Sequence, residues 1–169
     1  MLNNLLLVDI MTKIALDRTD IRILQVLQHD GRLSNVDLAE KVALSPTPCL
    51  RRVKRLEDEG VIECYQARLS RARVGLGITA FVHINLERHG PLVTNAFLVA
   101  VEAIDEIVSC HAVTGTFDFL LEVVTPTLED YSNVMLERLG GLPGVKALQT
   151  SFALRSTKSG QHMPLTHLE

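Results

Sequence analysis

The stretch that decides the N-terminal fold is Ser45–Leu56, with the sequence SPTPCLRRVKRL. Serine is a strong helix cap and proline suits the first helical position, so a helix is predicted to begin here. Four cations follow in this stretch, with no acid among them. On a helical wheel most of the apolar side chains fall on one side. The residues assigned to the core are Cys49, Leu50, Val53 and Leu56.

The wheel puts Thr47, Arg51 and Arg55 on the outer side, with Arg52 and Lys54 on its flanks. Guanidinium groups bond guanine edges and phosphates strongly, whereas an ordinary helix can carry the same charges as a solvated face. The helices predicted before this stretch favour contact with DNA over a solvated face. The predicted DNA-binding residues are Ser45, Thr47, Pro48, Arg51, Arg52, Lys54 and Arg55.

Two helix starts precede this stretch. Asp17 is followed three residues later by Asp20, and Ser34 repeats the signal before a short apolar segment. Ala43-Leu44 then forms the turn that leads into the basic helix. Three helices, the last two separated by a tight turn, predict a helix-turn-helix.

Beyond Gly60, Val61–Tyr65 and Gln66–Leu69 are predicted to be the two strands of a small wing. Ser70–Gly77 (SRARVGLG) has the composition of a hinge, in which Arg71 and Arg73 could contact phosphates. The expected domain boundaries are a tail at 1–15, a winged helix-turn-helix domain at 16–69, a hinge at 70–77, a second domain at 78–157 and a tail at 158–169. Whether residues 1–10 are native stays open, because Met11 is a second possible start.

The second half alternates apolar β-branched runs with helical spacing. The expected elements, in order, are a strand at 78–86, a helix at 91–104, strands at 107–114 and 117–124, a helix at 127–139 and a strand at 145–154. The order β-α-β-β-α-β predicts a ferredoxin-like domain and an α+β fold class overall. Helices cover one face of such a sheet, so a second copy of the chain is the expected partner of the other.

The formal net charge of -3 is unevenly distributed. Residues 1–70 carry ten cationic and ten acidic side chains, and residues 71–169 carry seven and ten, so positive charge is local to Arg51–Arg55. Three scattered cysteines and six histidines without ligand spacing predict reduced thiols and no metal site. No segment resembles a signal peptide or a membrane span, so a cytoplasmic, nucleoid-associated protein without a membrane partner is expected.

Four segments carry a resemblance to a known family: Leu16–Asn35, Leu44–Ile62, TGTFDFLL at Thr114–Leu121 and LPGV at Leu142–Val145. They resemble the Lrp/AsnC, or feast/famine, transcriptional regulators, and the likeness runs from about Leu16 to about Leu154. The resemblance implies a winged helix-turn-helix followed by an ACT/RAM-type effector domain. It also implies dimers that assemble to tetramers or octamers, two-fold operators, and an amino-acid effector bound between dimers.

By the same resemblance, the effector loop lies at Gly115–Asp118, where a glycine turn offers N–H groups to a carboxylate. Thr116 stands where relatives often have an acid, which leaves the identity of the effector open. Leucine or methionine is expected, with its side chain on apolar surface and its ammonium on Asp118. The full set of predicted effector-binding residues is Thr114, Gly115, Thr116, Phe117, Asp118, Leu128, Ser151 and Phe152.

Two other functions remain alternatives at this stage. Siroheme decarboxylases resemble the same architecture and use histidines, for which His83 and His111 are the candidates. A sensing module that acts through protein contacts without DNA is the second. The intact Arg51–Arg55 cluster favours a DNA-binding regulator, and no cofactor or catalytic residue is predicted.

Overall fold

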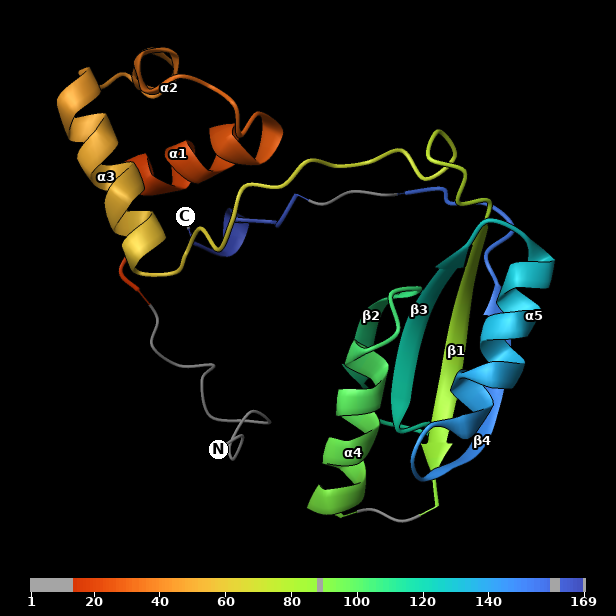
Figure 1. Cartoon of the computed structure of the whole chain (residues 1–169). Coiled ribbons are helices and arrows are strands. Elements are labelled where there is room, and N and C mark those ends of the chain that lie inside the picture. The colour runs from red at the N-terminus through yellow and green to blue at the C-terminus, as the bar shows by residue number, and fades with distance from the viewer. Residues whose placement is uncertain (1–13, 88–89, 159–161, 169) are drawn as a thin grey trace. The chain divides into compact units, whose positions relative to one another are not determined.

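A computed structural model describes residues 14–87, 90–158 and 162–168. The chain divides into two compact units, of which the first comprises Met1–Ala67 with Ser159–Glu169 and the second Arg68–Lys158 (Figure 1). Each unit has its own cluster of buried apolar side chains. The division falls between Ala67 and Arg68, before the change of hydrophobic periodicity near Ile78.

The first unit contains three helices: α1 (Arg18–His29), α2 (Asn35–Lys41) and α3 (Pro46–Asp58). α1 begins at a capping box in which Asp17 and Asp20 bond each other's backbone N–H groups. Ser34 caps α2 with its side chain, whereas Ser45 precedes α3 without a side-chain capping bond. Ala43 adopts a left-handed φ of +56°, so the turn is made without the expected glycine, at a cost of roughly 1–2 kcal/mol.

The core of this unit lies where the three helices meet. Its buried members are Ile23, Leu24, Leu38, Ala39, Val42, Cys49 and Leu56. One predicted core residue is wrong: Leu50 is 56% exposed. Leu50 follows Cys49 directly and is therefore rotated by roughly 100° from it, which takes the side chain out of the helix–helix contact.

The predicted two-stranded wing is also wrong, because residues 63–69 form no strand. Val61 and Ile62 instead pack against the helical core, and the Tyr65 hydroxyl donates to Glu57 at 2.9 Å. Burial and the Glu57 carboxylate raise the pKa of Tyr65 to about 12. These contacts hold the chain near the C-terminal end of α3, and no Gly-containing turn is present to reverse it between Tyr65 and Gln66.

The C-terminal segment differs from the expected tail, since residues 162–168 pack against the helices of the first unit. Leu165 lies against their core and precedes the short 3₁₀ helix η3 (Thr166–Leu168). The Gln28 amide bonds both the N–H and the carbonyl of Met163, and the rings of His29 and His162 lie 4.1 Å apart.

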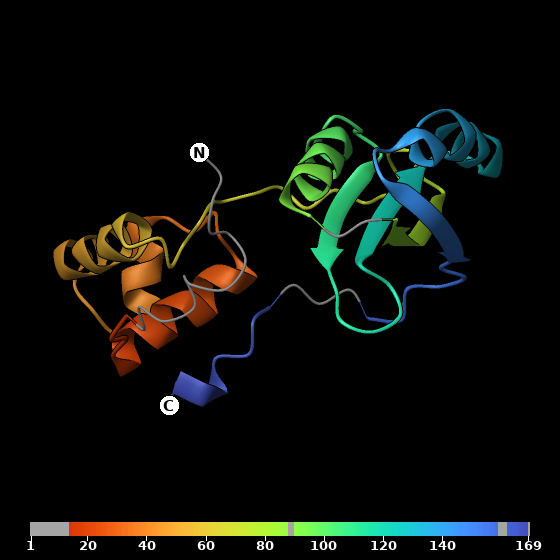
Figure 2. The ribbon, with the colours of Figure 1, turned by 90° about the horizontal axis from the view of Figure 1, so that it is seen from below.

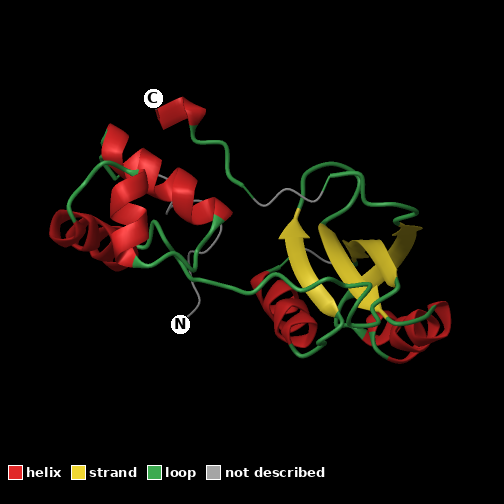
Figure 3. Ribbon diagram, turned by 90° about the horizontal axis from the view of Figure 1, so that it is seen from above, coloured by secondary structure: helices red, strands yellow, loops and turns green. Residues whose placement is uncertain are grey.

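The second unit is an antiparallel sheet of four strands with helices on one face (Figures 2 and 3). The strands are β1 (Ile78–Leu86), β2 (Ile107–Ala112), β3 (Phe119–Thr125) and β4 (Val145–Phe152), in the spatial order β2-β3-β1-β4. The helices are α4 (Pro91–Glu102), α5 (Leu128–Glu137) and the 3₁₀ turn η2 (Leu139–Gly141). This is the predicted β-α-β-β-α-β arrangement, so the α+β fold class is confirmed.

Strand alternation determines which side chains meet the helices. Ala80, Val82, Ile84 and Leu86 of β1 are buried, and they pack with Phe97 of α4 among others. Phe81, His83 and Asn85 alternate with them and lie on the sheet face that carries no helix. We call this the open sheet face. Cys110 packs on the core and His111 is exposed, as the alternation of β2 requires.

Candidate DNA interface and effector site

The outer face of α3 is formed by four side chains at helical spacing. The exposed residues are Thr47, Leu50, Arg51 and Lys54. Within the described part of the chain, the side chains of Arg51 and Lys54 take part in no ion pair or hydrogen bond. The helix N-terminus adds partial positive charge near Thr47. This face therefore presents a hydroxyl, an apolar side chain and two uncommitted cations on one rigid element.

The other two cations of the cluster are held inside the unit. Arg52 bonds Asp17 and Asp20 at 2.6 and 2.8 Å, and Arg55 bonds Asp20 at 2.5 Å. The Asp20 side chain is only 1% exposed. The hydrogen bonds that Arg52 donates to the Asp17 and Asp20 carboxylates raise the pKa of Arg52. Arg55, expected on the outer side, thus bonds α1 while its side chain stays 42% exposed, and both arginines hold α3 to α1.

One contact at the start of α3 and one within the second unit were not expected from the sequence. Asn35 donates from its side-chain amide to the Pro46 carbonyl at 2.8 Å, which fixes the start of α3 against α2. Arg71 bonds Glu122 at 2.7 Å and Thr79 at 3.3 Å, within the second unit. The suggested phosphate contact by Arg71 is thus replaced by an internal ion pair.

The predicted effector loop, Gly115–Asp118, lies in the connection between β2 and β3. Its Gly115 has a φ of +116°, a conformation that favours glycine. The Asp118 carboxylate accepts from the Leu86 N–H at 2.9 Å, and the Asp118 N–H donates to the Ile84 carbonyl at 2.9 Å. The loop is therefore fastened to the end of β1 by both the backbone and the side chain of Asp118.

The remaining predicted effector residues lie at the opposite end of the sheet. Leu128 begins α5, which follows the far end of β3, and Phe152 pairs with Ala80 near the start of β1. The seven residues of β3, about 23 Å at 3.3 Å each, separate the loop from this end. Phe152 packs its ring on Tyr131 and remains 42% exposed. The single chain therefore does not bring the two groups together, and their joint role in an effector site stays a prediction.

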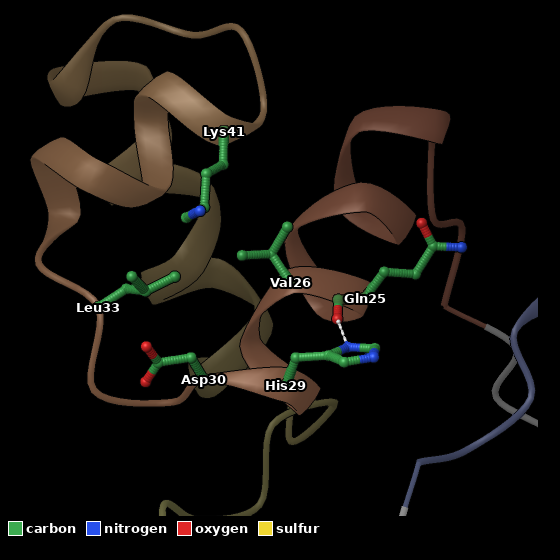
Figure 4. Close-up of a pocket in the computed structure, with 6 residues that line it drawn as sticks. All are labelled: Gln25, Val26, His29, Asp30, Leu33 and Lys41. Atoms are coloured by element: carbon green, nitrogen blue, oxygen red, sulfur yellow. Dashed lines mark hydrogen bonds between the residues drawn. The ribbon is translucent and has the colours of Figure 1, made fainter.

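A hollow of about 440 Å³ lies in the first unit, and none of the predicted effector residues lines it (Figure 4). Gln25, Val26, His29, Asp30, Leu33 and Lys41 line it. The His29 ring bonds the Gln25 carbonyl at its edge. Among the residues that the structure describes, no cluster of acids, histidines and cysteines could hold a metal ion. None of the described helices combines the length and apolar character needed to cross a membrane.

Comparisons with known proteins cover both units. The model of the Lrp/AsnC ligand binding domain matches residues 79–163, and a model of winged helix-turn-helix DNA-binding domains matches residues 16–63. The leucine-responsive regulatory protein of Escherichia coli K12 is 43% identical over 148 residues, which span 88% of this chain and 90% of that protein.

Solved structures of transcriptional regulators also match most of this chain. A transcriptional regulator from Neisseria meningitidis, in complex with L-Met, has a TM-score of 0.87 and 44% identity, covering 91% of this chain and 99% of that one. An AsnC family regulator from Agrobacterium tumefaciens has a TM-score of 0.86 and 33% identity, and the match covers 90% of this chain and 99% of that one. With both units matched in fold and sequence, the chain belongs to the Lrp/AsnC family of transcriptional regulators.

Proposed function

We propose that this regulator binds two-fold operators through the outer face of α3. The observation that carries the proposal is that Arg51 and Lys54 are exposed cations with no ion-pair partner among the described residues. Thr47 lies on the same face, with Ser45 and Pro48 at the helix start, and arginine in this position can bond guanine bidentately. Arg52 and Arg55 support the interface by fixing the helix, and their partly exposed ends extend its positive potential.

The open sheet face is proposed to bind a second copy of the chain. It carries Phe81, His83 and Leu120, and the His83 ring packs on Phe117 at a centroid distance of 4.6 Å. The Nδ1 atom of His83 is buried and makes no hydrogen bond within the described chain. A two-fold dimer would cover the apolar side chains and matches the symmetry of a two-half-site operator, with tetramers or octamers built from it.

The proposed effector is an apolar amino acid, leucine or methionine. Support comes from two relatives, a leucine-responsive regulatory protein and a regulator whose structure was solved in complex with L-Met. The Gly115 turn offers backbone N–H groups for the α-carboxylate, and Asp118 offers negative charge for the ammonium. Because one chain separates this loop from Leu128 and Phe152, we place the complete site between copies, with the loop of one copy facing the apolar end of another. The regulator acts at DNA in the cytoplasm under this proposal.

Two measurements on the full chain test this function. Fluorescence anisotropy with a labelled duplex from the gene's own upstream region should show binding that weakens steeply with salt. Differential scanning fluorimetry should show a rise in melting temperature with L-leucine or L-methionine, and none with D-leucine, glutamate or lysine. Absence of duplex binding at low salt would favour a sensing module without DNA. A preference for charged amino acids would indicate that Thr116 has redirected the effector site.

A further inference from the structure

Leu50 is an apolar side chain in the centre of a face otherwise made of polar groups. It is 56% exposed, with Thr47 three residues before it and Lys54 four residues after it on the same side of α3. The core side of the helix is filled by Cys49, Leu56 and the half-buried Val53. Leu50 therefore has no place in the core, and its exposure is fixed by the rotation of the helix.

The rotation of α3 is itself fixed by the Asp20 ion pairs. Arg52 and Arg55 both reach Asp20 on α1, so that flank of α3 is turned inward. Thr47, Leu50, Arg51 and Lys54 consequently face outward together on one rigid surface. Whatever approaches Arg51 and Lys54 also approaches Leu50, because side chains at these spacings are neighbours on a helix.

The major groove of DNA offers one apolar group on its base edges, the C5-methyl group of thymine. We propose that Leu50 contacts a thymine methyl in each half-site and thereby contributes to operator specificity. The contact would bury apolar surface of both groups beside the polar contacts of Arg51. The proposal rests on the outer face of α3 being the DNA interface, and it adds a residue that the distribution of charge alone does not indicate.

The neighbouring charges favour DNA over an apolar protein partner for Leu50. Two cations without internal partners flank it, and burying them against an apolar surface would leave unpaired charges at a high cost. Against a duplex the same cations meet phosphates and base acceptors. A methyl group among those acceptors is the one feature that an exposed leucine matches and a polar side chain does not.

Replacement of thymine by uracil tests the contact because it removes only the methyl group. The full-length protein first selects its operator from a random duplex library, and each dT of one half-site is then replaced by dU. At one position the parent should lose roughly fourfold in affinity, the factor expected for burying one methyl-sized group. Leu50→Ala should show little or no loss at that same position, whereas Leu50→Met should keep the sensitivity.

Val36→Ala is the matched control, since Val36 is an exposed apolar residue (61%) on α2 of the same unit. This variant should keep the full uracil sensitivity of the parent. Equal sensitivity of the parent and a folded Leu50→Ala protein at every thymine would overturn the contact, as would a parent indifferent to all replacements. Failure to select any duplex would instead overturn the DNA interface itself, so the two failures are distinguishable.

Discussion

The Asp20 carboxylate on α1 accepts a hydrogen bond from the Arg52 guanidinium on α3 at 2.8 Å, across 32 residues of sequence. The same carboxylate bonds Arg55 with its other oxygen. A buried acid thus helps to fix the rotation of α3, the proposed DNA-facing helix. It also divides a run of four cations into two that hold the helix and two that face outward.

Asp20→Asn should loosen α3 without removing any group from its outer face. The amide cannot neutralise two guanidinium groups, and breaking a buried pair costs several kcal/mol, so a loss of about 2 kcal/mol is expected for these partly exposed arginines. Hydrogen exchange of the α1 and α3 amides should accelerate accordingly. Asp58→Asn, at an exposed acid near the end of α3, serves as the control and should leave exchange unchanged. Equal exchange in Asp20→Asn and the parent would contradict the proposed role.

Arg51→Ala and Arg52→Ala should have different effects, the first on operator binding and the second on stability. Arg51→Ala should lose roughly 1–3 kcal/mol of operator binding and relax specificity at one base pair, with an unchanged melting temperature. Arg52→Ala should instead lower the stability of the first unit, because Asp20 loses one of its two partners. Lys54→Ala should weaken all duplexes evenly and reduce the salt slope by about one. Operator anisotropy at several salt concentrations, combined with thermal unfolding, separates the three; an unstable Arg51→Ala protein would contradict this division.

The starts of the helices could be predicted because they depend on neighbouring residues. The capping box at Asp17–Asp20 is a local pattern and forms as expected, and Thr127 and Asp130 form a second box at the start of α5. The exposure of Leu50 could not be predicted as readily, because it depends on how α3 is rotated against α1. That rotation is set by Asp20, which neither the wheel of α3 nor the spacing of its cations contains.

The predicted effector residues show the same contrast between features set by neighbouring residues and features set by tertiary packing. The hairpin at Gly115 follows from the sequence, but its distance from Phe152 depends on the direction and pairing of three strands. The prediction of a two-stranded wing was wrong because it, too, depended on contacts distant in sequence. The apolar residues at its start, Val61 and Ile62, are used by the helical core, which leaves an exposed segment with no turn signal.

Acid should destabilise the first unit partly through Asp17. The Asp20 N–H, and next the Arg52 side chain, lower the pKa of the Asp17 carboxyl below its ordinary value of 3.8. Its contribution is therefore fully present above that ordinary value and is lost as the pH falls through the lower folded-state pKa. Asp17→Asn keeps a capping side chain but cannot titrate, so its melting temperature should fall less steeply below pH 4 than that of the parent. An Asp58→Asn control should follow the parent, and identical slopes in all three would argue against Asp17.

The C-terminal segment should stabilise α1. Deleting residues 162–169 removes two hydrogen bonds to Gln28 and the packing of Leu165, for an expected loss of about 1–3 kcal/mol in the first unit. Hydrogen exchange of the α1 amides measures the loss locally. Gln28→Ala should give a smaller change in the same direction, and Gln66→Ala, at an exposed linker position, should give none. Unchanged exchange after the deletion would mean that the segment does not hold α1 in solution.

A complementation experiment can decide whether the effector site lies between copies. Asp118→Asn keeps an acceptor for the Leu86 N–H but removes the charge proposed for the ligand's ammonium. Leu128→Glu places a charge on the exposed apolar start of α5, where a helix N-terminus tolerates an acid. Each variant alone should bind neither leucine nor methionine, as measured by isothermal titration calorimetry.

Oligomers co-assembled from equal amounts of the two variants should regain about a quarter of the sites if each site combines a loop and a surface from different copies. A site within one chain would regain none, because every copy carries one defect. Oligomers of the parent with the double variant provide the control, because the same between-copy model again gives about a quarter, whereas a site within one chain gives about half. We expect the first mixture to regain sites and the mixture with the double variant to show about a quarter of them. The reason is that the length of β3 separates Asp118 from Leu128 within one chain.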